Sequence, residues 1–199
     1  DSVQESMQLL NTKSLHCLLL HNAIDLLKPG GDKLFSKLHD LKDKGMILKL
    51  GVSLYSNSPV IDLINNFDLD IVQVPFNIID RTIITKGYLE LFKQHDIEVQ
   101  ARSIFLQGLL LMNPKKRPTY FNKWSTKLNL FFDLCHMHKI SPIEASLLFV
   151  NSFPEIDSLI IGVNNTKQLS EIIESYHSVN NIDENTLNIS TFNVLSSDD

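Results

Sequence analysis

The segment ILKLGVSLYSNSP at residues 47–59 contains the pattern that decides the fold. Residues 47–52 are a short, mostly apolar run, which is typical of a strand buried in a parallel sheet. The polar residue Ser53 ends the run, and Ser58-Pro59 then provides a serine N-cap and a proline at the first helical position. The segment therefore predicts a β-strand that leads through a short loop into an α-helix.

The same order of short apolar strand, polar or glycine residue and helix-like stretch recurs along the chain. The further predicted strands are residues 15–20, 70–74, 97–101 and 158–161. The residues at or just past the strand ends are His21, Ser53, Gln73, Arg102 with Ser103, and Gly162. Such alternation predicts βαβ crossovers and a parallel sheet. Because loops at the carboxyl ends of parallel strands converge on one crevice, these residues are predicted to belong to an active site.

The spacing of the predicted strands favours an α/β protein of the (β/α)₈ TIM-barrel class. A full barrel needs about 250 residues, or roughly 30 per unit. The chain has 199 residues, so we expect an incomplete barrel of about five parallel βα units. We place the barrel domain at residues 1–179 and a polar, loosely ordered tail at residues 180–199. Unpaired edge strands and an apolar inner sheet face would favour self-association.

Composition excludes several classes of partner. The net charge of −5 and the pI near 5.8 argue against a nucleic-acid surface. No apolar run reaches the length of about 18 residues that a membrane span requires, and the start lacks the pattern of a signal peptide.

Cys17 lies within an apolar strand, far in sequence from Cys135, which favours a reducing compartment and a cytoplasmic protein. The first residue is Asp rather than Met, which suggests a natural start upstream.

Two clusters of polar residues could suggest a functional site, but each has a simpler structural explanation. In Cys135-His136-x-His138, residues two apart on a helix point to different faces, so we predict no metal site. Lys115-Lys116-Arg117 lies between prolines, where a solvated loop is the simpler explanation and a flap over a cofactor is the alternative.

Over about residues 1–177 the chain resembles the aldo/keto reductases, whose motifs it carries in the family's order. The motifs are Leu18-Leu19-Leu20-His21, Gly51-Val52-Ser53, residues 71–77 (IVQVPFN), residues 101–110 (ARSIFLQGLL) and residues 160–163 (IIGV). The likeness is greatest to a bacterial branch with an Arg-Ser-x-Phe-x-Gln-Gly run. It implies the last five strands of the barrel. It also implies hydride transfer from a nicotinamide cofactor, NADP or NAD in its reduced form, to a small aldehyde or ketone.

The resemblance implies one catalytic residue, His21, which matches the family histidine that hydrogen-bonds the substrate carbonyl. The family's aspartate, tyrosine and lysine have no matching positions in this sequence. Tyr55 lies near a predicted strand end but matches a packing aromatic. Because reduction of a carbonyl needs a proton source, we expect a reductase in the complete protein and no activity from this chain alone. The alternatives are a non-catalytic, cofactor-binding remnant and an unrelated open α/β ligand-binding domain.

The resemblance also assigns the residues near the nicotinamide. Ser53 and Gln73 match the pair that hydrogen-bonds the carboxamide, although Leu54 replaces the asparagine that usually follows the serine. Arg102 replaces a tyrosine that stacks under the nicotinamide, and a planar guanidinium can stack in its place. A solvated charge at the rim is the alternative for Arg102.

The rest of the dinucleotide is assigned to two loops. The loop that wraps the pyrophosphate is matched by Ser103, Phe105, Gln107 and Gly108. The loop and helix start that hold the adenosine half are matched by Gly162, Asn164 and Gln168, with Glu171 near the adenine amino group. Strongly NADPH-selective members carry a lysine and an arginine where Gly162 and Gln168 stand, which weakens the case for NADPH. Lys167 could compensate, although a solvated helix face explains it as well.

Overall fold

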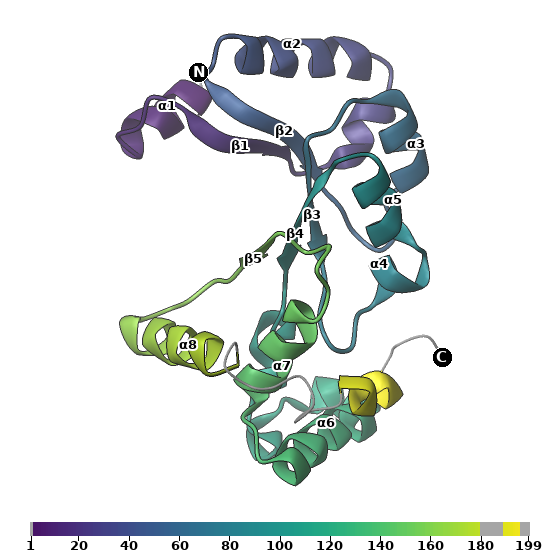
Figure 1. Ribbon diagram of the computed structural model, residues 1–199, viewed down its shortest axis with the longest axis vertical. Coiled ribbons are helices and arrows are strands. Elements are labelled where there is room, and N and C mark those ends of the chain that lie inside the picture. Colours follow the sequence, from purple (N-terminus) through teal and green to yellow (C-terminus); the bar gives the residue numbers. More distant parts are fainter. Residues whose placement is uncertain (1, 180–188, 196–199) are drawn as a thin grey trace. The chain divides into compact units, whose positions relative to one another are not determined.

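The computed structural model describes residues 2–179 and 189–195, in which strands and helices alternate (Figure 1). In chain order the elements, with η for a 3₁₀ helix, are α1 (Ser2–Leu9), β1 (Leu15–Leu20), η1 (Ala23–Leu27), α2 (Gly31–Asp43), β2 (Ile47–Ser53), α3 (Val60–Asn66), β3 (Ile71–Pro75), α4 (Thr82–Thr85), α5 (Tyr88–Gln94), β4 (Glu98–Arg102), η2 (Leu106–Leu111), η3 (Pro114–Lys116), η4 (Thr119–Trp124), α6 (Ser125–His138), α7 (Pro142–Asn151), β5 (Ser158–Ile160), α8 (Thr166–Val179) and η5 (Ile189–Leu195). The five predicted strands are all present, and their ends lie within one residue of the predicted ends.

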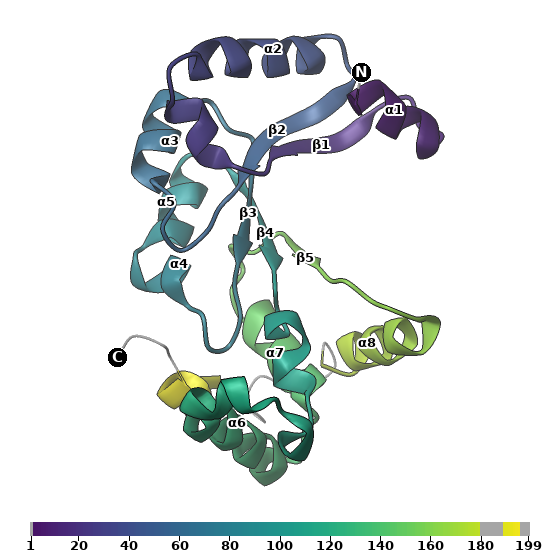
Figure 2. The same ribbon diagram turned by 180° about the vertical axis from the view of Figure 1, so that it is seen from behind.

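The strands follow one another in the sheet in the order β1-β2-β3-β4-β5. The pairs β1–β2 and β2–β3 are parallel, and β1 and β2 lie side by side in both views of the chain (Figures 1 and 2). Strand order that follows chain order, without the reversal of a doubly wound sheet, is the winding of a (β/α)₈ barrel. The register places Leu20 beside Val52 and Ser53 beside Gln73.

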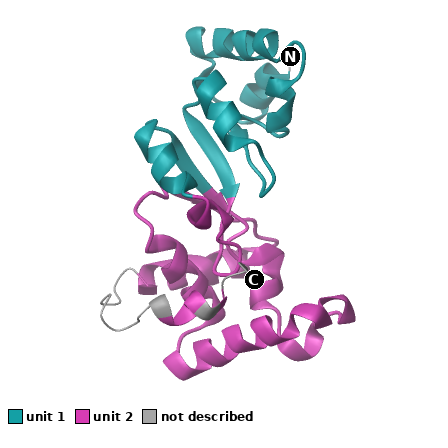
Figure 3. Cartoon of the chain, turned by 90° about the vertical axis from the view of Figure 1, so that its right-hand side faces the viewer, with its two compact units in different colours: residues 1–74, 87–100 teal, residues 75–86, 101–199 magenta. Residues whose placement is uncertain are grey.

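The chain divides into two compact units, which Figure 3 shows in different colours. Unit 1 comprises residues 1–74 and 87–100, and unit 2 comprises residues 75–86 and 101–199. The predicted boundary between residues 179 and 180 stays a prediction, because residues 180–188 lie outside the described part of the chain. Within that part, no helix is both long and apolar enough to cross a membrane.

In unit 1, a glycine allows β2 and β3 to approach. Gly51 stands opposite Ile71, and a Cβ atom at Gly51 would lie 1.8 Å from the carbonyl oxygen of Ile71. A side chain at this position would collide with backbone, which cannot move away as a flexible side chain can. The close approach is therefore what brings Ser53 and Gln73 together, two residues further along the strands.

The sequence predicts an apolar inner sheet face, and this prediction is wrong for the face that carries Ser53 and Gln73. On β2, residues 49, 51 and 53 point to one face, and Lys49 pairs there with Glu98 of β4. The side-chain amide of Gln73 donates to Oε1 of Gln100 at 3.3 Å. Polar side chains can occupy this face because they satisfy one another across the strands.

In unit 2, an aromatic core forms beneath helix α7. Phe76, Phe149 and Phe153 contact one another with ring centroids 5.1–5.3 Å apart. Helix α7 begins at Pro142 as Ser141-Pro142 suggests, and Ser141 forms a capping box with Glu144. The two serines Ser141 and Ser178 donate to the Glu144 carboxylate. Burial raises the pKa of Glu144, but these hydrogen bonds outweigh it and leave the pKa below its usual value.

The expectation of a loosely ordered tail is wrong for residues 189–195, which form η5. Phe192 and Leu195 are buried, and the Phe192 ring lies against Phe131 of α6. The buried Arg81 donates from Nη1 to Oδ1 of Asn193 at 2.7 Å and from Nη2 to the carbonyl oxygen of Phe192 at 2.5 Å. Two apolar side chains three residues apart therefore attach this part of the tail to unit 2.

Candidate functional site

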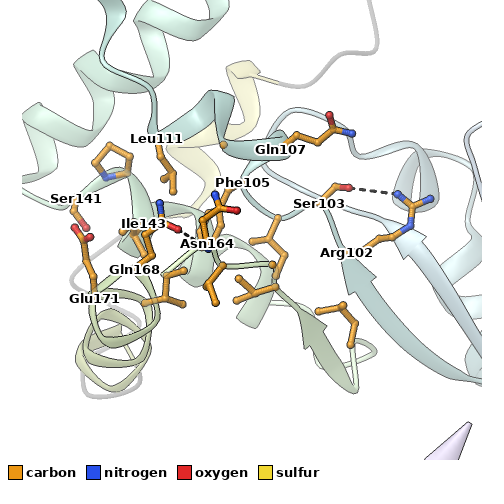
Figure 4. Close-up of a pocket in the computed structure, with 18 residues that line it drawn as sticks. Arg102, Ser103, Phe105, Gln107, Leu111, Ser141, Ile143, Asn164, Gln168 and Glu171 are labelled. Carbon is orange, nitrogen blue, oxygen red and sulfur yellow. Dashed lines mark hydrogen bonds between the residues drawn. The ribbon is translucent and has the colours of Figure 1, made fainter. Parts of the chain in front are cut away.

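Unit 2 contains a cavity of about 760 Å³ that is bounded by the end of β4, the loop that follows it, the start of α7, β5 and the first turns of α8 (Figure 4). This volume lies in the range typical of small-molecule sites. Nine of the predicted site residues line the cavity: Arg102, Ser103, Phe105, Gln107, Gly108, Gly162, Asn164, Gln168 and Glu171. Two segments some sixty residues apart in the chain, around residues 105 and 165, thus line the same cavity.

The loop after β4 has an unusual backbone. Ser103, Leu106 and Gln107 have φ values of 59°, 48° and 55°, and Gly108 has φ 86°. Only glycine adopts this region without a steric penalty, and other residues persist there when their surroundings fix them. Short backbone hydrogen bonds within the loop, such as Gly108 N–H to the carbonyl oxygen of Phe105 at 2.9 Å, provide that constraint. The N–H of Leu106 is also donated within the loop, to the carbonyl oxygen of Ser103 at 2.8 Å. Gly108 lines the cavity, and its lack of a side chain lets a ligand approach the backbone closely.

A buried asparagine after β3 holds this loop in place. Asn77 has no exposed surface, and its side-chain nitrogen donates to the carbonyl oxygen of Ser103 at 3.2 Å. Its side-chain oxygen accepts from the N–H groups of Ile79 and Asp80 at 3.0 and 2.9 Å. Sequence reasoning quoted Asn77 within a motif but gave it no role. Its position between two loops makes it a support for the cavity wall.

The start of α8 forms the opposite wall. Asn165 accepts from the N–H of Gln168 at 2.9 Å, and the Gln168 side-chain oxygen accepts from the N–H of Asn164 at 2.9 Å. Figure 4 marks the hydrogen bond between Gln168 and the backbone of Asn164 with a dashed line. The side-chain oxygen of Gln168 therefore already accepts a hydrogen bond from the loop, and the side-chain nitrogen can donate to a ligand.

The charges around the cavity are few. Among the described residues that line it, Arg102 is the one cationic side chain and Glu171 the one anionic side chain. Nη1 of Arg102 lies 3.4 Å from Oγ of Ser103, next to which Figure 4 draws it. The cavity thus has one positive charge, on Arg102 at the end of β4, and one carboxylate, on Glu171 of α8.

The remaining three predicted residues belong to unit 1. His21 is exposed just past the end of β1, and Ser53 is buried at the end of β2. Gln73 of β3 is the register partner of Ser53 and is half-buried. The structure therefore brings Ser53 and Gln73 together, as their predicted shared role requires.

Tyr55 is not the packing aromatic that sequence reasoning expected. Its side chain is 44% exposed, and its hydroxyl lies 3.3 Å from Nε2 of His21, with the two rings edge to face. Leu54, where the resembled family carries asparagine, is buried at 3% exposure. Tyr55 follows the end of β2 and begins a turn in which its N–H donates to Oγ of Ser58 at 2.8 Å.

Comparison with known proteins assigns the chain to a family. The model of the aldo/keto reductase family matches residues 1–188. The chain is an aldo/keto reductase family member. A curated relative, the uncharacterized oxidoreductase YqkF of Bacillus subtilis, is 24% identical over 184 residues, which are 88% of this chain and 59% of the relative. The chain thus spans about six-tenths of the length of that relative.

Solved structures of aldo-keto reductases share the fold. AKR11C1 from Bacillus halodurans in its apo form has a TM-score of 0.75 at 18% identity, covering 98% of this chain and 66% of that one. A putative aldo-keto reductase from Pseudomonas aeruginosa has a TM-score of 0.60 at 18% identity, covering 89% of this chain and 56% of that one. The expected fold class, a (β/α)₈ family protein with about five of its units, is confirmed. The alternative of an unrelated open α/β domain is wrong.

Proposed function

We propose that this aldo/keto reductase family chain binds a nicotinamide dinucleotide in unit 2, as part of a protein that reduces small aldehydes or ketones. The observation that carries the proposal is the cavity, around which nine independently predicted residues lie. The oxidoreductase relative and the family match support the same reaction class. One of the similar solved structures, AKR11C1, is described in a holo form, which supports a bound cofactor in that protein.

The residues present fit the phosphate and adenosine parts of such a cofactor. The loop after β4 offers the Ser103 hydroxyl and, at Gly108, close approach of the backbone to a pyrophosphate, and the Arg102 guanidinium adds positive charge. Residues 162–171 offer a loop, an amide and a carboxylate for the adenosine half. In this proposal Arg102 binds the nicotinamide end, and Ser53 and Gln73, which are neighbours within unit 1, stay the predicted carboxamide pair. When bound, the cofactor supplies the hydride of the reaction.

His21 is the group that we assign to the substrate. An exposed imidazole at a strand end can hydrogen-bond a carbonyl oxygen and polarise it. The sequence has no match for the family's aspartate, tyrosine and lysine, and loss of a positioned general acid lowers a rate by about 10²–10⁴. We therefore propose that these 199 residues alone do not reduce carbonyls at a measurable rate.

The same observations favour a second candidate, a protein that binds the cofactor without reducing a substrate. The cavity walls are supported from several elements, whereas only one residue of the family's catalytic set has a match. We propose no strong preference between NADP and NAD, since one cation and one carboxylate line the described cavity. A cytoplasmic location is supported by the free thiols of Cys17 and Cys135.

Cofactor binding by matched glycine variants tests the proposal. Gly108 and Gly45 both have positive φ, and a Cβ at either would meet no atom within 4 Å. The backbone cost of Gly108→Ala and Gly45→Ala is therefore similar, but only Gly108 lines the cavity. In titrations of NADPH and NADH followed by calorimetry, we expect weaker binding for Gly108→Ala and wild-type binding for Gly45→Ala.

A turnover assay separates the two candidates. The chain is mixed with NADPH or NADH and a panel of aldehydes and ketones, and oxidation is followed at 340 nm. Binding without turnover supports the proposal for these residues. Absence of binding to either cofactor refutes it. Saturable reduction that is lost in His21→Ala shows that the chain contains its own acid and excludes the non-catalytic candidate.

A further inference from the structure

Residues 113–124, between η2 and α6, form a surface segment that is rich in cations and aromatic rings. From residue 99 to residue 132 the sequence has no aspartate or glutamate, yet six of the chain's 18 lysines and arginines lie there. Lys115, Lys116 and Lys123 are exposed, and the described lining of the cavity includes no residue of this segment. We propose that the segment binds the surface of a membrane that contains anionic lipids. The proposal does not rest on the proposed cofactor site.

The segment is held in a fixed shape by its own hydrogen bonds and by α6. Asn113 accepts at Oδ1 from the N–H of Lys115 at 2.9 Å, and its carbonyl oxygen accepts from the N–H of Lys116 at 2.8 Å. Arg117 donates from Nη1 to Oδ1 of Asn129, a residue of α6, at 2.9 Å. The backbone that carries the lysines is therefore ordered before a ligand binds, which lowers the entropic cost of binding.

The aromatic rings of η4 form a surface cluster with a lysine. Tyr120 is 70% exposed and Trp124 is 41% exposed. The half-buried ring of Phe121 lies between them in sequence, with its centroid 5.1 Å from that of Tyr120 and 6.1 Å from that of Trp124. The Lys123 ammonium lies 3.9 Å from the centroid of the Trp124 ring, where a cation and a π face attract each other. Tyrosine and tryptophan, which join an apolar ring to a polar group, collect at the boundary between lipid and water.

The charges of the segment are complementary to anionic headgroups. None of the ion pairs found among the described residues involves Lys115, Lys116 or Lys123. Each lysine near an anionic membrane strengthens binding roughly fivefold. The chain's net charge of −5 does not cancel this attraction, because salt screens charges that are more than about 8 Å away. The cytoplasmic leaflet of a cell membrane carries anionic lipids, so the surface agrees with the proposed location.

Single-stranded nucleic acid is the other polyanion that cations and aromatic rings bind, and it fits this segment less well. Such binding uses ring faces on which bases stack. Here the Lys123 ammonium lies over the Trp124 ring, and Tyr120 meets Phe121 edge to face at 87°. The rings are therefore engaged with their neighbours in ways that do not leave a row of parallel faces for successive bases.

Trp124 is the only tryptophan in the sequence, so its fluorescence reports on this segment alone. The chain is titrated with vesicles of equal parts phosphatidylcholine and phosphatidylserine, and separately with vesicles of phosphatidylcholine. Both titrations are repeated with lipids brominated on their acyl chains, which quench tryptophan on contact. The test variant is Lys115→Gln/Lys116→Gln. The control is Lys33→Gln/Lys37→Gln, which removes the same charge from exposed positions on α2 in unit 1.

We expect the mixed vesicles to shift the Trp124 emission to shorter wavelength, and the brominated lipid to quench it. Affinity for phosphatidylcholine alone should be roughly 100-fold lower, as expected for three lysines. The Lys115→Gln/Lys116→Gln variant should bind mixed vesicles roughly 25-fold more weakly than wild type, and the control should bind as wild type does.

Four results would each overturn the proposal: no binding of mixed vesicles, binding without quenching, equal affinities of the two double variants, and tighter binding of an oligothymidylate than of vesicles. The last result would assign the segment to nucleic acid. No arm of the experiment contains a cofactor, so failure to bind NADPH or NADH would refute the proposed function without affecting this result.

Discussion

Replacing Gly51 by alanine tests whether the close approach of β2 and β3 holds the sheet of unit 1 together. The added Cβ would lie 1.8 Å from the carbonyl oxygen of Ile71 and 2.7 Å from its Cγ2. Ordinary contact begins near 3.4 Å, so the strands must separate by more than an ångström at this point. Overpacking of this kind costs about 1–3 kcal/mol, and each ladder hydrogen bond that is lost adds about 1 kcal/mol.

We therefore expect Gly51→Ala to lower the free energy of unfolding by about 3 kcal/mol. For a protein of this length that corresponds to a fall in Tm of about 6–12 °C, measured by circular dichroism in thermal and urea unfolding. Gly162→Ala is the control, because a Cβ there meets no atom within 4 Å and its φ is not left-handed. The control should melt within about 2 °C of wild type. If Gly51→Ala also melts there, the strand approach described for Gly51 is wrong.

Three further changes have definite expected outcomes. Arg102→Ala should weaken NADH binding by about 1 kcal/mol, or roughly fivefold, through lost stacking, whereas Lys116→Ala should not; equal titrations for both would remove Arg102 from the site. Phe192→Ala should destabilise the chain by about 3 kcal/mol in urea unfolding, since this buried ring attaches η5 to α6; an unchanged midpoint would contradict that contact. Burial raises the pKa of Cys135 to about 12, so in a Cys17→Ser variant, which removes the other free thiol, Cys135 should stay unreactive toward Ellman's reagent at pH 8 until the chain unfolds; rapid labelling of that variant in its native state would contradict this.

The strands could be predicted from the sequence because their signals are local. Each apolar run ends in a polar or glycine residue, and Ser58-Pro59 and Ser141-Pro142 mark helix starts close to where the helices begin. The polar pairing on the sheet face could not be predicted. That Lys49 meets Glu98 depends on the register of strands far apart in the chain, which no local pattern contains.

The candidate site likewise contains residues that the sequence predicted and residues that it could not predict. The residues that line the cavity follow from motifs, which the family resemblance interprets one by one. Asn77 was missed because its function depends on contact with Ser103, a residue on another loop. The contact of Tyr55 with His21 was missed for the same reason, because it joins residues on two different strand ends. Phe192 and Leu195 carried a signal too, namely apolar residues three apart within a polar tail.

The central claim is that the loops around residues 102–108 and 162–171 of this chain bind a nicotinamide dinucleotide. The most direct test is a ¹H–¹⁵N NMR titration of the chain with NADPH and, separately, with NADH. The account predicts saturable shifts of backbone amides in these two segments, including those of Ser103 and Gly108, which line the cavity. Shifts confined to other segments, or none at millimolar cofactor, would contradict it.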